Sequence, residues 1–136
     1  MNITHIEHIG IAVRDLEATI DYYEQVLGLS CYSVELVPDQ QVRTAFFKVG
    51  ETKLELLEAT SPESPIAKFI EQRGEGLHHL AFAVKAVQPA LDLALQKNIR
   101  LIDQAPRPGA EGLNIAFLHP KSTFSVLTEL CERPQS

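Results

Sequence analysis

Hydrophobic and polar residues recur with a regular period along the chain, and the pattern occurs twice. Residues 8–13 and 79–84 have the same order: histidine, large apolar, small, large apolar, alanine, valine. Apolar residues spaced three or four apart follow both hexamers, at 16–27 and at 87–95, which is typical of an amphipathic helix. The repeat predicts a strand followed by a helix at the start of each half.

Capping residues indicate where these helices begin and end. Asp15 is a suitable N-cap for the first helix, Gly28 a suitable end, and Asn98 would end the helix of the second half. A separate linker helix is predicted over about 64–74, because Ser64 fits an N-cap and Pro65 fits the first helical position.

Further strands are predicted after each helix from apolar runs bounded by turn residues. In the first half they are 30–37, 42–49 and 52–59, and in the second half 99–102, 113–118 and 124–131. Each half therefore has the order βαβββ, in a module of about residues 3–60 and another of about 77–132. We expect an α+β fold in which the two tandem modules and the linker helix form a single domain over residues 1–136.

Composition narrows the function classes. The net charge is −6 and no basic cluster is present, which argues against nucleic acid or an anionic membrane as a partner. No apolar stretch approaches the roughly 18 residues of a membrane span, and the N-terminus does not resemble a signal peptide. Cys31 and Cys131 lack CxxC spacing, so two buried thiols in a reducing compartment are expected, and the protein is expected to be cytoplasmic.

Candidate chemistry lies on the faces of the predicted strands. Alternate residues of a strand share a face, so the faces of His8 and His79 are lined by small residues (Gly10 and Ala12; Ala81 and Ala83). On the later strands, Glu55 and Glu129 are flanked by leucines, and a carboxylate in apolar surroundings is costly unless it is paired or coordinates a cation.

A single histidine or glutamate in a strand is more often an ordinary structural residue than a ligand. The recurrence of both residue types at equivalent positions favours joint ligation, and two imidazoles with carboxylates suit Co²⁺, Zn²⁺, Ni²⁺, Mn²⁺ or Fe²⁺. The other histidines carry less weight: His5 is expected to be exposed, His78 to face away from the site, and His119 to lie in a turn.

The paired modules, with histidine near the first strand and glutamate on the last, resemble the vicinal oxygen chelate superfamily, which includes glyoxalase I. Within it, particular stretches resemble the methylmalonyl-CoA epimerase family from end to end of the chain: residues 8–13, 50–57, 64–69, 76–79, 117–121 and 126–130. The resemblance implies a curved eight-stranded mixed sheet around a metal site. It also implies a homodimer and a CoA thioester substrate.

By the resemblance, His8, Glu55, His79 and Glu129 would be the metal ligands, and Glu129 and Glu55 the candidate acid and base. Some family members carry glutamine at the Glu55 position and an acid on the preceding strand, where this chain has Thr44. Glu55 is therefore a ligand, a base, or both in turn.

The implied reaction removes and returns the C2 proton of a 2-substituted malonyl thioester, with cobalt as the expected metal in vitro. Several cationic and polar residues are candidates to bind the substrate: Lys121 and Ser122 above all, with Lys53 and Arg107. The alternatives are a glyoxalase I-type lyase, a ring-cleaving dioxygenase, and a non-enzymatic module that binds a small molecule.

Overall fold

The computed structural model describes residues Met1–Pro134, which divide into two compact units. The first unit is His8–His78, and the second comprises Met1–Glu7 and the chain from His79 onward. Strands β1 (Ile3–Ala12) and β5 (Gly76–Val84) each contribute residues to both units. Within Met1–Pro134, no helix has the length and hydrophobicity that crossing a membrane requires.

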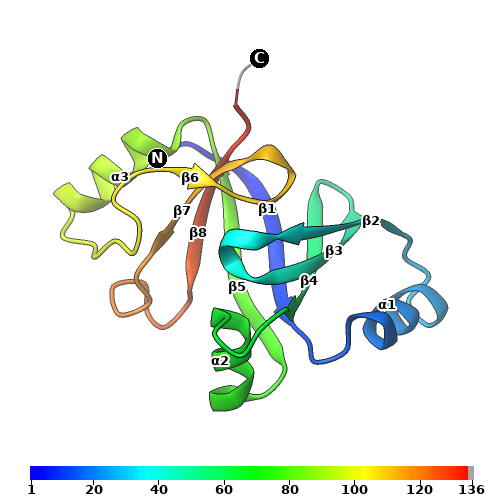
Figure 1. The fold of residues 1–136 in the computed structure, drawn as a ribbon. Coiled ribbons are helices and arrows are strands. Elements are labelled where there is room, and N and C mark those ends of the chain that lie inside the picture. Colours follow the sequence, from blue (N-terminus) through cyan, green and yellow to red (C-terminus); the bar gives the residue numbers. More distant parts are fainter. Residues whose placement is uncertain (135–136) are drawn as a thin grey trace. The chain divides into compact units, whose positions relative to one another are not determined.

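The first unit contains the predicted strands and helices of the first half (Figure 1). After β1 come α1 (Leu16–Gln25), β2 (Cys31–Val37), a 3-10 turn (Pro38–Gln40), β3 (Val42–Val49), β4 (Thr52–Ala59) and α2 (Pro65–Arg73). The strand order is β2-β3-β4-β1. Only the β1–β4 pair is parallel here, because α1 and two further strands separate them in the chain.

The second unit follows the same plan with shorter strands (Figure 1). After β5 come α3 (Val87–Gln96), β6 (Arg107–Pro108), a 3-10 turn (Ala110–Gly112), β7 (Asn114–Leu118) and β8 (Thr128–Glu132). The strand order is β5-β8-β7-β6, with β5 and β8 parallel and the other pairs antiparallel. The predicted α+β class is confirmed: eight strands between Met1 and Pro134 form a mixed sheet, accompanied by three α-helices.

Helices cover opposite faces of the strands in the first unit. Leu16 of α1 packs with Phe47 of β3 and Leu56 of β4, whose side chains lie on one face of these strands. On the other face, Ile66 of α2 packs with a cluster that includes Ala12 and Leu57. The small side chain of Ala12 is thus partly explained by the close approach of α2 to this face.

One helix covers the sheet of the second unit. Val87, Leu91 and Ala94 of α3 pack against Ala116, Leu118 and Leu130 of β7 and β8. The opposite face carries a separate hydrophobic cluster of Ala81, Leu113, Ile115, Phe117 and Cys131. This second face is the one to which the candidate site belongs.

The predicted helix ends are largely confirmed. The Asp15 carboxylate accepts the Ala18 N–H at 3.0 Å, and the Ser64 hydroxyl accepts the Ile66 N–H at 3.2 Å. Asn98 has a left-handed φ of 63°, as expected for a residue that ends a helix. The first helix stops at Gln25, before Gly28, which has a φ of 73°.

Three predictions for the later chain are wrong in detail. Residues 99–102 form only a single bridge, Leu101 to Leu118, because Ile99 turns inward to pack on the core under α3. The edge strand of the second unit is instead Arg107–Pro108, which lies between the predicted strands 99–102 and 113–118. The last strand begins at Thr128 and not at 124, because Phe124 and Ser125 have left-handed φ values of 57° and 71°, which extended strands do not have.

Candidate functional site

In the first unit, one histidine and one glutamate form a buried pair. Strands β1 and β4 run parallel with Gly10 opposite Glu55, so His8 and Glu55 extend from the same face. His8 Nδ1 lies 3.2 Å from Glu55 Oε2. The two residues are only 3% and 5% exposed, so this contact is shielded from water.

The second unit contains an equivalent pair. Strands β5 and β8 run parallel with Ala81 opposite Glu129, which puts His79 and Glu129 on one face. His79 Nε2 lies 3.1 Å from Glu129 Oε1, and the residues are 9% and 3% exposed. Each unit therefore brings the histidine and the glutamate of its own module together.

The same strand register produces both pairs. Each glutamate stands opposite the small residue two positions after the histidine, which is Gly10 in one module and Ala81 in the other. The small residues seen in the sequence therefore lie directly opposite the glutamate in both modules.

The donor atoms of the pairs suit a borderline divalent cation. Imidazole nitrogen and carboxylate oxygen are the ligands that Zn²⁺, Co²⁺ and Ni²⁺ accept. A buried carboxylate is costly unless a hydrogen bond or a cation stabilises it, and each glutamate here is almost fully withdrawn from water. The residues present therefore fit a metal in their chemistry and in their burial.

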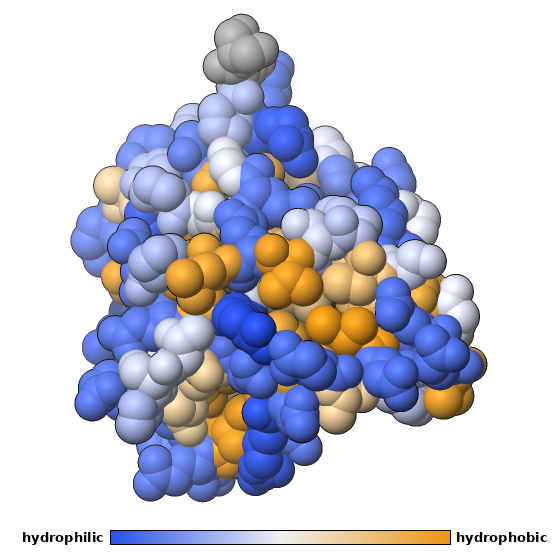
Figure 2. Space-filling view, turned by 45° about the vertical axis from the view of Figure 1, so that its right-hand side comes forward, coloured by the Kyte–Doolittle hydropathy of each residue, from blue (hydrophilic) through white to orange (hydrophobic). Residues whose placement is uncertain are grey.

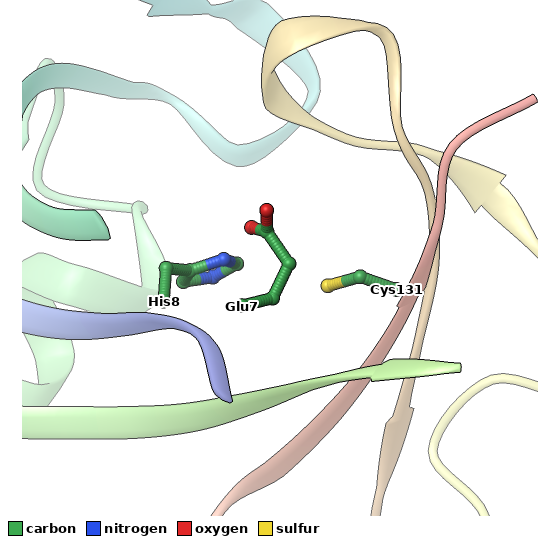
Figure 3. Close-up of side chains that lie close together, drawn as sticks. All are labelled: Glu7, His8 and Cys131. Atoms are coloured by element: carbon green, nitrogen blue, oxygen red, sulfur yellow. The ribbon is translucent and has the colours of Figure 1, made fainter. Parts of the chain in front are cut away.

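A cysteine that was not a site candidate contacts Glu129, and a buried glutamate lies close to that cysteine. The Cys131 thiol donates a hydrogen bond to Glu129 Oε2 at 3.1 Å, while Glu129 Oε1 faces His79. Glu7 is 8% exposed, and one of its carboxylate oxygens lies within 4.8 Å of Cys131 Sγ. Figure 3 shows the Cys131 sulfur directed toward the Glu7 side chain. In the sequence, Cys131 could have been noticed because it lies two residues after Glu129 and so shares its strand face, whereas Glu7 is adjacent to His8 and gives no such signal.

The cysteine prediction is half correct. Cys131 is buried, as expected, and neither cysteine is part of a disulfide. Cys31 is only partly buried, because it begins β2, the outermost strand of the first unit, where one side of the strand has no neighbour.

Two of the candidate substrate-binding residues, Lys121 and Ser122, lie in the turn between β7 and β8, whereas Lys53 lies buried on β4 and Arg107 lies on β6. Ser122 Oγ accepts the backbone N–H of Arg100 at 2.9 Å, so this hydroxyl has a structural partner. Lys121 is exposed, and its backbone N–H donates to His119 Nδ1 at 3.1 Å. His119 is therefore a turn residue, as expected.

The remaining histidines have local partners. The His78 ring packs edge-on against Phe69 of α2, with centroids 4.9 Å apart. His5 is partly buried, where exposure was expected, and its Nδ1 lies 2.9 Å from the Thr4 hydroxyl. His5 lies within β1.

Thr44 lies on β3 and is almost fully buried, at 1% exposed. Its partner in β4 is Leu57, whereas the residue opposite Glu55 is Phe46. The Phe46 ring in turn packs with Tyr32 of β2 at 5.8 Å. On this strand, Glu55 thus has aromatic rather than acidic neighbours.

A second group of carboxylates in the first unit is structural. Oxygens of Asp15, Glu17 and Glu58 lie within 4.8 Å of one another at the start of α1. Arg43 bonds to Glu17 at 2.5 Å and to Glu58 at 3.2 Å. The hydrogen bond from Arg43 lowers the pKa of Glu17, and the same bond raises the pKa of Arg43. Glu17 and Glu58 already have a counter-charge, and Asp15 and Glu58 cap the helix.

Comparison with known proteins identifies a family. Residues 7–117 match the model of the Glyoxalase/Bleomycin resistance protein/Dioxygenase superfamily. The chain is 43% identical over 130 residues to the uncharacterized protein YqjC of Bacillus subtilis, covering 96% of this chain and 93% of that protein.

Two further relatives are named for an activity. Human mitochondrial methylmalonyl-CoA epimerase is 35% identical over 130 residues, covering 95% of this chain and 74% of that protein. A variant of Streptomyces coelicolor methylmalonyl-CoA epimerase, solved in complex with 2-nitronate-propionyl-CoA, is 38% identical with a TM-score of 0.94. That match covers 97% of this chain and 96% of the other.

Proposed function

Because the chain belongs to the Glyoxalase/Bleomycin resistance protein/Dioxygenase superfamily, we propose that it acts as a methylmalonyl-CoA epimerase. In this proposal it interconverts the 2R and 2S forms of methylmalonyl-CoA by removing and returning the C2 proton. Relatives of 35% and 38% identity that carry this name support the assignment.

The observation that carries the proposal is the buried histidine–glutamate contact that each module repeats. The contact distances are 3.2 Å for His8 and Glu55 and 3.1 Å for His79 and Glu129. A module that only bound an apolar molecule would gain nothing from burying two carboxylates, each of which costs free energy. Catalysis that moves a proton needs such groups.

We propose His8, Glu55, His79 and Glu129 as the ligands of one divalent metal, with cobalt, zinc, nickel and manganese as the candidate ions. When bound, such an ion would supply Lewis-acid stabilisation of the negative charge that develops on the thioester oxygen. The histidines would contribute to metal binding, because a neutral imidazole has one unprotonated ring nitrogen whose lone pair can bind the metal.

The carboxylates would move the proton. Glu129 and Glu55 are the acid–base pair of this proposal, one accepting the C2 proton and the other returning a proton to the opposite face. The thiol of Cys131 holds Glu129 Oε2, and this hydrogen bond fixes the orientation of the carboxylate. A positioned acid or base contributes roughly 10²- to 10⁴-fold to a rate.

The test is exchange of the C2 proton. The protein, loaded with Co²⁺, is incubated with methylmalonyl-CoA in D₂O, and loss of the C2 proton signal is followed by NMR. We expect exchange that a chelator abolishes and that Glu129→Gln lowers by roughly 10²- to 10⁴-fold. Exchange no faster than in buffer would overturn the proposal, and a hemithioacetal would then be the next substrate to test.

Two further variants complete the experiment. Glu63 is exposed in the turn before α2, so Glu63→Gln is a matched control that should exchange like the wild type. Glu55→Gln separates the roles of that residue. If Glu55 is a base, exchange falls while cobalt affinity is kept, and if it is chiefly a ligand, cobalt affinity falls first.

We also propose a homodimer, as the resemblance implies. The edge strand β2 exposes Val34 and Leu36, at 50% and 59%, and the surface shows hydrophobic groups among hydrophilic ones (Figure 2). Apolar side chains on an unpaired strand favour association. Light scattering of the wild type and of Val34→Glu tests this, and a monomeric wild type would contradict it.

A further inference from the structure

Arg107 is held in place from two directions. Its Nε–H donates to Asp103 Oδ1 at 2.9 Å, and its Cζ lies 5.5 Å from the centroid of the Phe117 ring. The other oxygen of Asp103 accepts the backbone N–H of Phe117 at 2.8 Å. One carboxylate therefore fixes the guanidinium and the strand beneath it in a single arrangement.

Strand register places Arg107 on the face of the candidate site. Arg107 pairs with Ile115, and Ile115 pairs with Cys131. Residues that pair directly across antiparallel strands project from the same face of the sheet. Cys131 is the residue whose thiol bonds to Glu129, so Arg107 and Glu129 share that face.

The ring under Arg107 also contacts the histidine of this unit. Phe117 meets the His79 ring edge-on, with centroids 5.6 Å apart and planes at 79°. His79 is in turn 3.1 Å from Glu129. The guanidinium is thus one aromatic ring away from the histidine–glutamate pair.

The chemistry of a guanidinium fits a carboxylate at this point. Asp103 engages the Nε–H, and the hydrogen bonds within Met1–Pro134 leave the N–H groups of the two terminal amino nitrogens of Arg107 for a ligand. A pair of parallel N–H donors matches the two oxygens of a carboxylate. The Arg107 side chain is 36% exposed, so a ligand can reach it.

We propose that Arg107 binds the free carboxylate of the acyl group, and so makes the site select 2-carboxyacyl thioesters over acyl thioesters that lack it. This inference rests on the proposed function. The substrate carboxylate is attached to the reacting carbon, whereas the phosphates of CoA are separated from the thioester by the whole pantetheine chain. A guanidinium one ring away from the reactive pair therefore matches the carboxylate and not the phosphates. Asp103 is a positioning residue in this proposal.

The experiment compares two ligands that differ only in the carboxylate. Dissociation constants of methylmalonyl-CoA and propionyl-CoA are measured by calorimetry on the Co²⁺-loaded protein, for the wild type and for Arg107→Gln. We expect Arg107→Gln to weaken methylmalonyl-CoA by roughly 10- to 100-fold and to leave propionyl-CoA within about twofold. Equally weakened binding of both ligands would assign Arg107 to the phosphates and overturn the proposal. Unchanged binding of both ligands would also overturn it.

Three further variants serve as controls for the role of Arg107. Arg100 is exposed in the same unit, and Arg100→Gln, which removes the same charge, should leave both constants unchanged. Arg107→Lys keeps the charge but loses the paired N–H donors and the Nε–H. If the glutamine variant fails to fold, the lysine variant tests whether the paired donors are what binds the carboxylate. Asp103→Asn should raise KM for methylmalonyl-CoA with kcat nearly unchanged.

Binding and proton exchange separate this inference from the proposed function. A wild type that prefers methylmalonyl-CoA, and loses the preference in Arg107→Gln, supports the role of Arg107 even if C2 exchange is absent. Exchange that persists with an unchanged ligand preference in Arg107→Gln supports the epimerase and overturns the role of Arg107.

Discussion

Glu132 Oε1 accepts the backbone N–H of Val87 at 2.8 Å, so the last strand of the second unit caps its own helix α3. The first unit has the same arrangement, in which Glu58 Oε2 accepts the N–H of Leu16 at 2.8 Å. Each capping glutamate comes three residues after a candidate site glutamate of the same strand: Glu58 after Glu55, and Glu132 after Glu129. One short segment in each module therefore presents a site carboxylate on one face and fixes a helix on the other.

The first prediction concerns this cap. The N-cap of α3 is Ala86, which offers no side-chain acceptor, so Glu132 replaces the missing cap. Glu132→Ala should lower the free energy of unfolding by about 1 kcal/mol, the usual value of a lost cap. Urea unfolding measures it, with Glu63→Ala as an exposed control. Identical midpoints for the two variants would show that the contact contributes nothing.

The second prediction concerns metal affinity. His8→Asn and His79→Asn should each weaken Co²⁺ binding by more than about tenfold, because each removes one proposed ligand while leaving the strand intact. Calorimetric titration with Co²⁺ measures this, and His119→Asn provides a control in a turn residue. Wild-type affinity in either of the two strand variants would remove that histidine from the ligand set.

The sequence predicted most of the first unit. Strands β3 and β4 occupy the predicted 42–49 and 52–59, because alternating apolar residues and clear turns bound them. The helix caps at Asp15 and Ser64 are also as predicted, since a cap depends on residues adjacent in the chain. The internal repeat predicted the candidate site residues, because it identified the histidine and glutamate of each module as equivalent.

The second unit was harder to predict for physical reasons. Strand β6 has two residues and includes a proline, so it has no alternation to detect, and its pairing with β7 depends on tertiary contacts. The hydrogen bond that Arg107 donates to Asp103 spans a turn whose shape no local pattern indicates. The role of Cys131 required knowing which carboxylate oxygen it faces.

The third prediction uses backbone conformation. Ser125 has a φ of 71° in the turn before β8, a conformation that costs L-residues about 1–2 kcal/mol and glycine much less. Ser125→Gly should therefore stabilise the protein by about 0.5–1 kcal/mol, after the greater freedom of glycine in the unfolded chain is subtracted. Its backbone N–H bond to Pro120 is kept.

The control for this variant is Ser30→Gly. Ser30 is not among the residues with positive φ, so glycine there should have no such benefit and should slightly lower stability. Thermal or urea unfolding compares the two. If both serine variants are destabilised alike, the turn at Ser125 does not store strain.

The last prediction concerns pH and the turn after β7. Partial burial, and then the positive charges of Arg100 and Lys121, lower the pKa of His119 below its usual 6.5. The imidazole Nδ1 accepts the Lys121 N–H, which a protonated ring could not do. In the folded state the ring therefore stays neutral at a pH where the unfolded chain has already taken up a proton. Because the unfolded state binds more protons, the contribution of His119 to the free energy of unfolding should fall as the pH drops from about 6.5 to the lowered pKa, and this contribution should stay constant below it.

NMR titration of the His119 ring protons gives the pKa directly. Unfolding of the wild type and of His119→Gln across this range isolates its contribution, since the two proteins differ only in this side chain. A His119 pKa at or above 6.5, or the same pH dependence in the variant, would contradict the prediction.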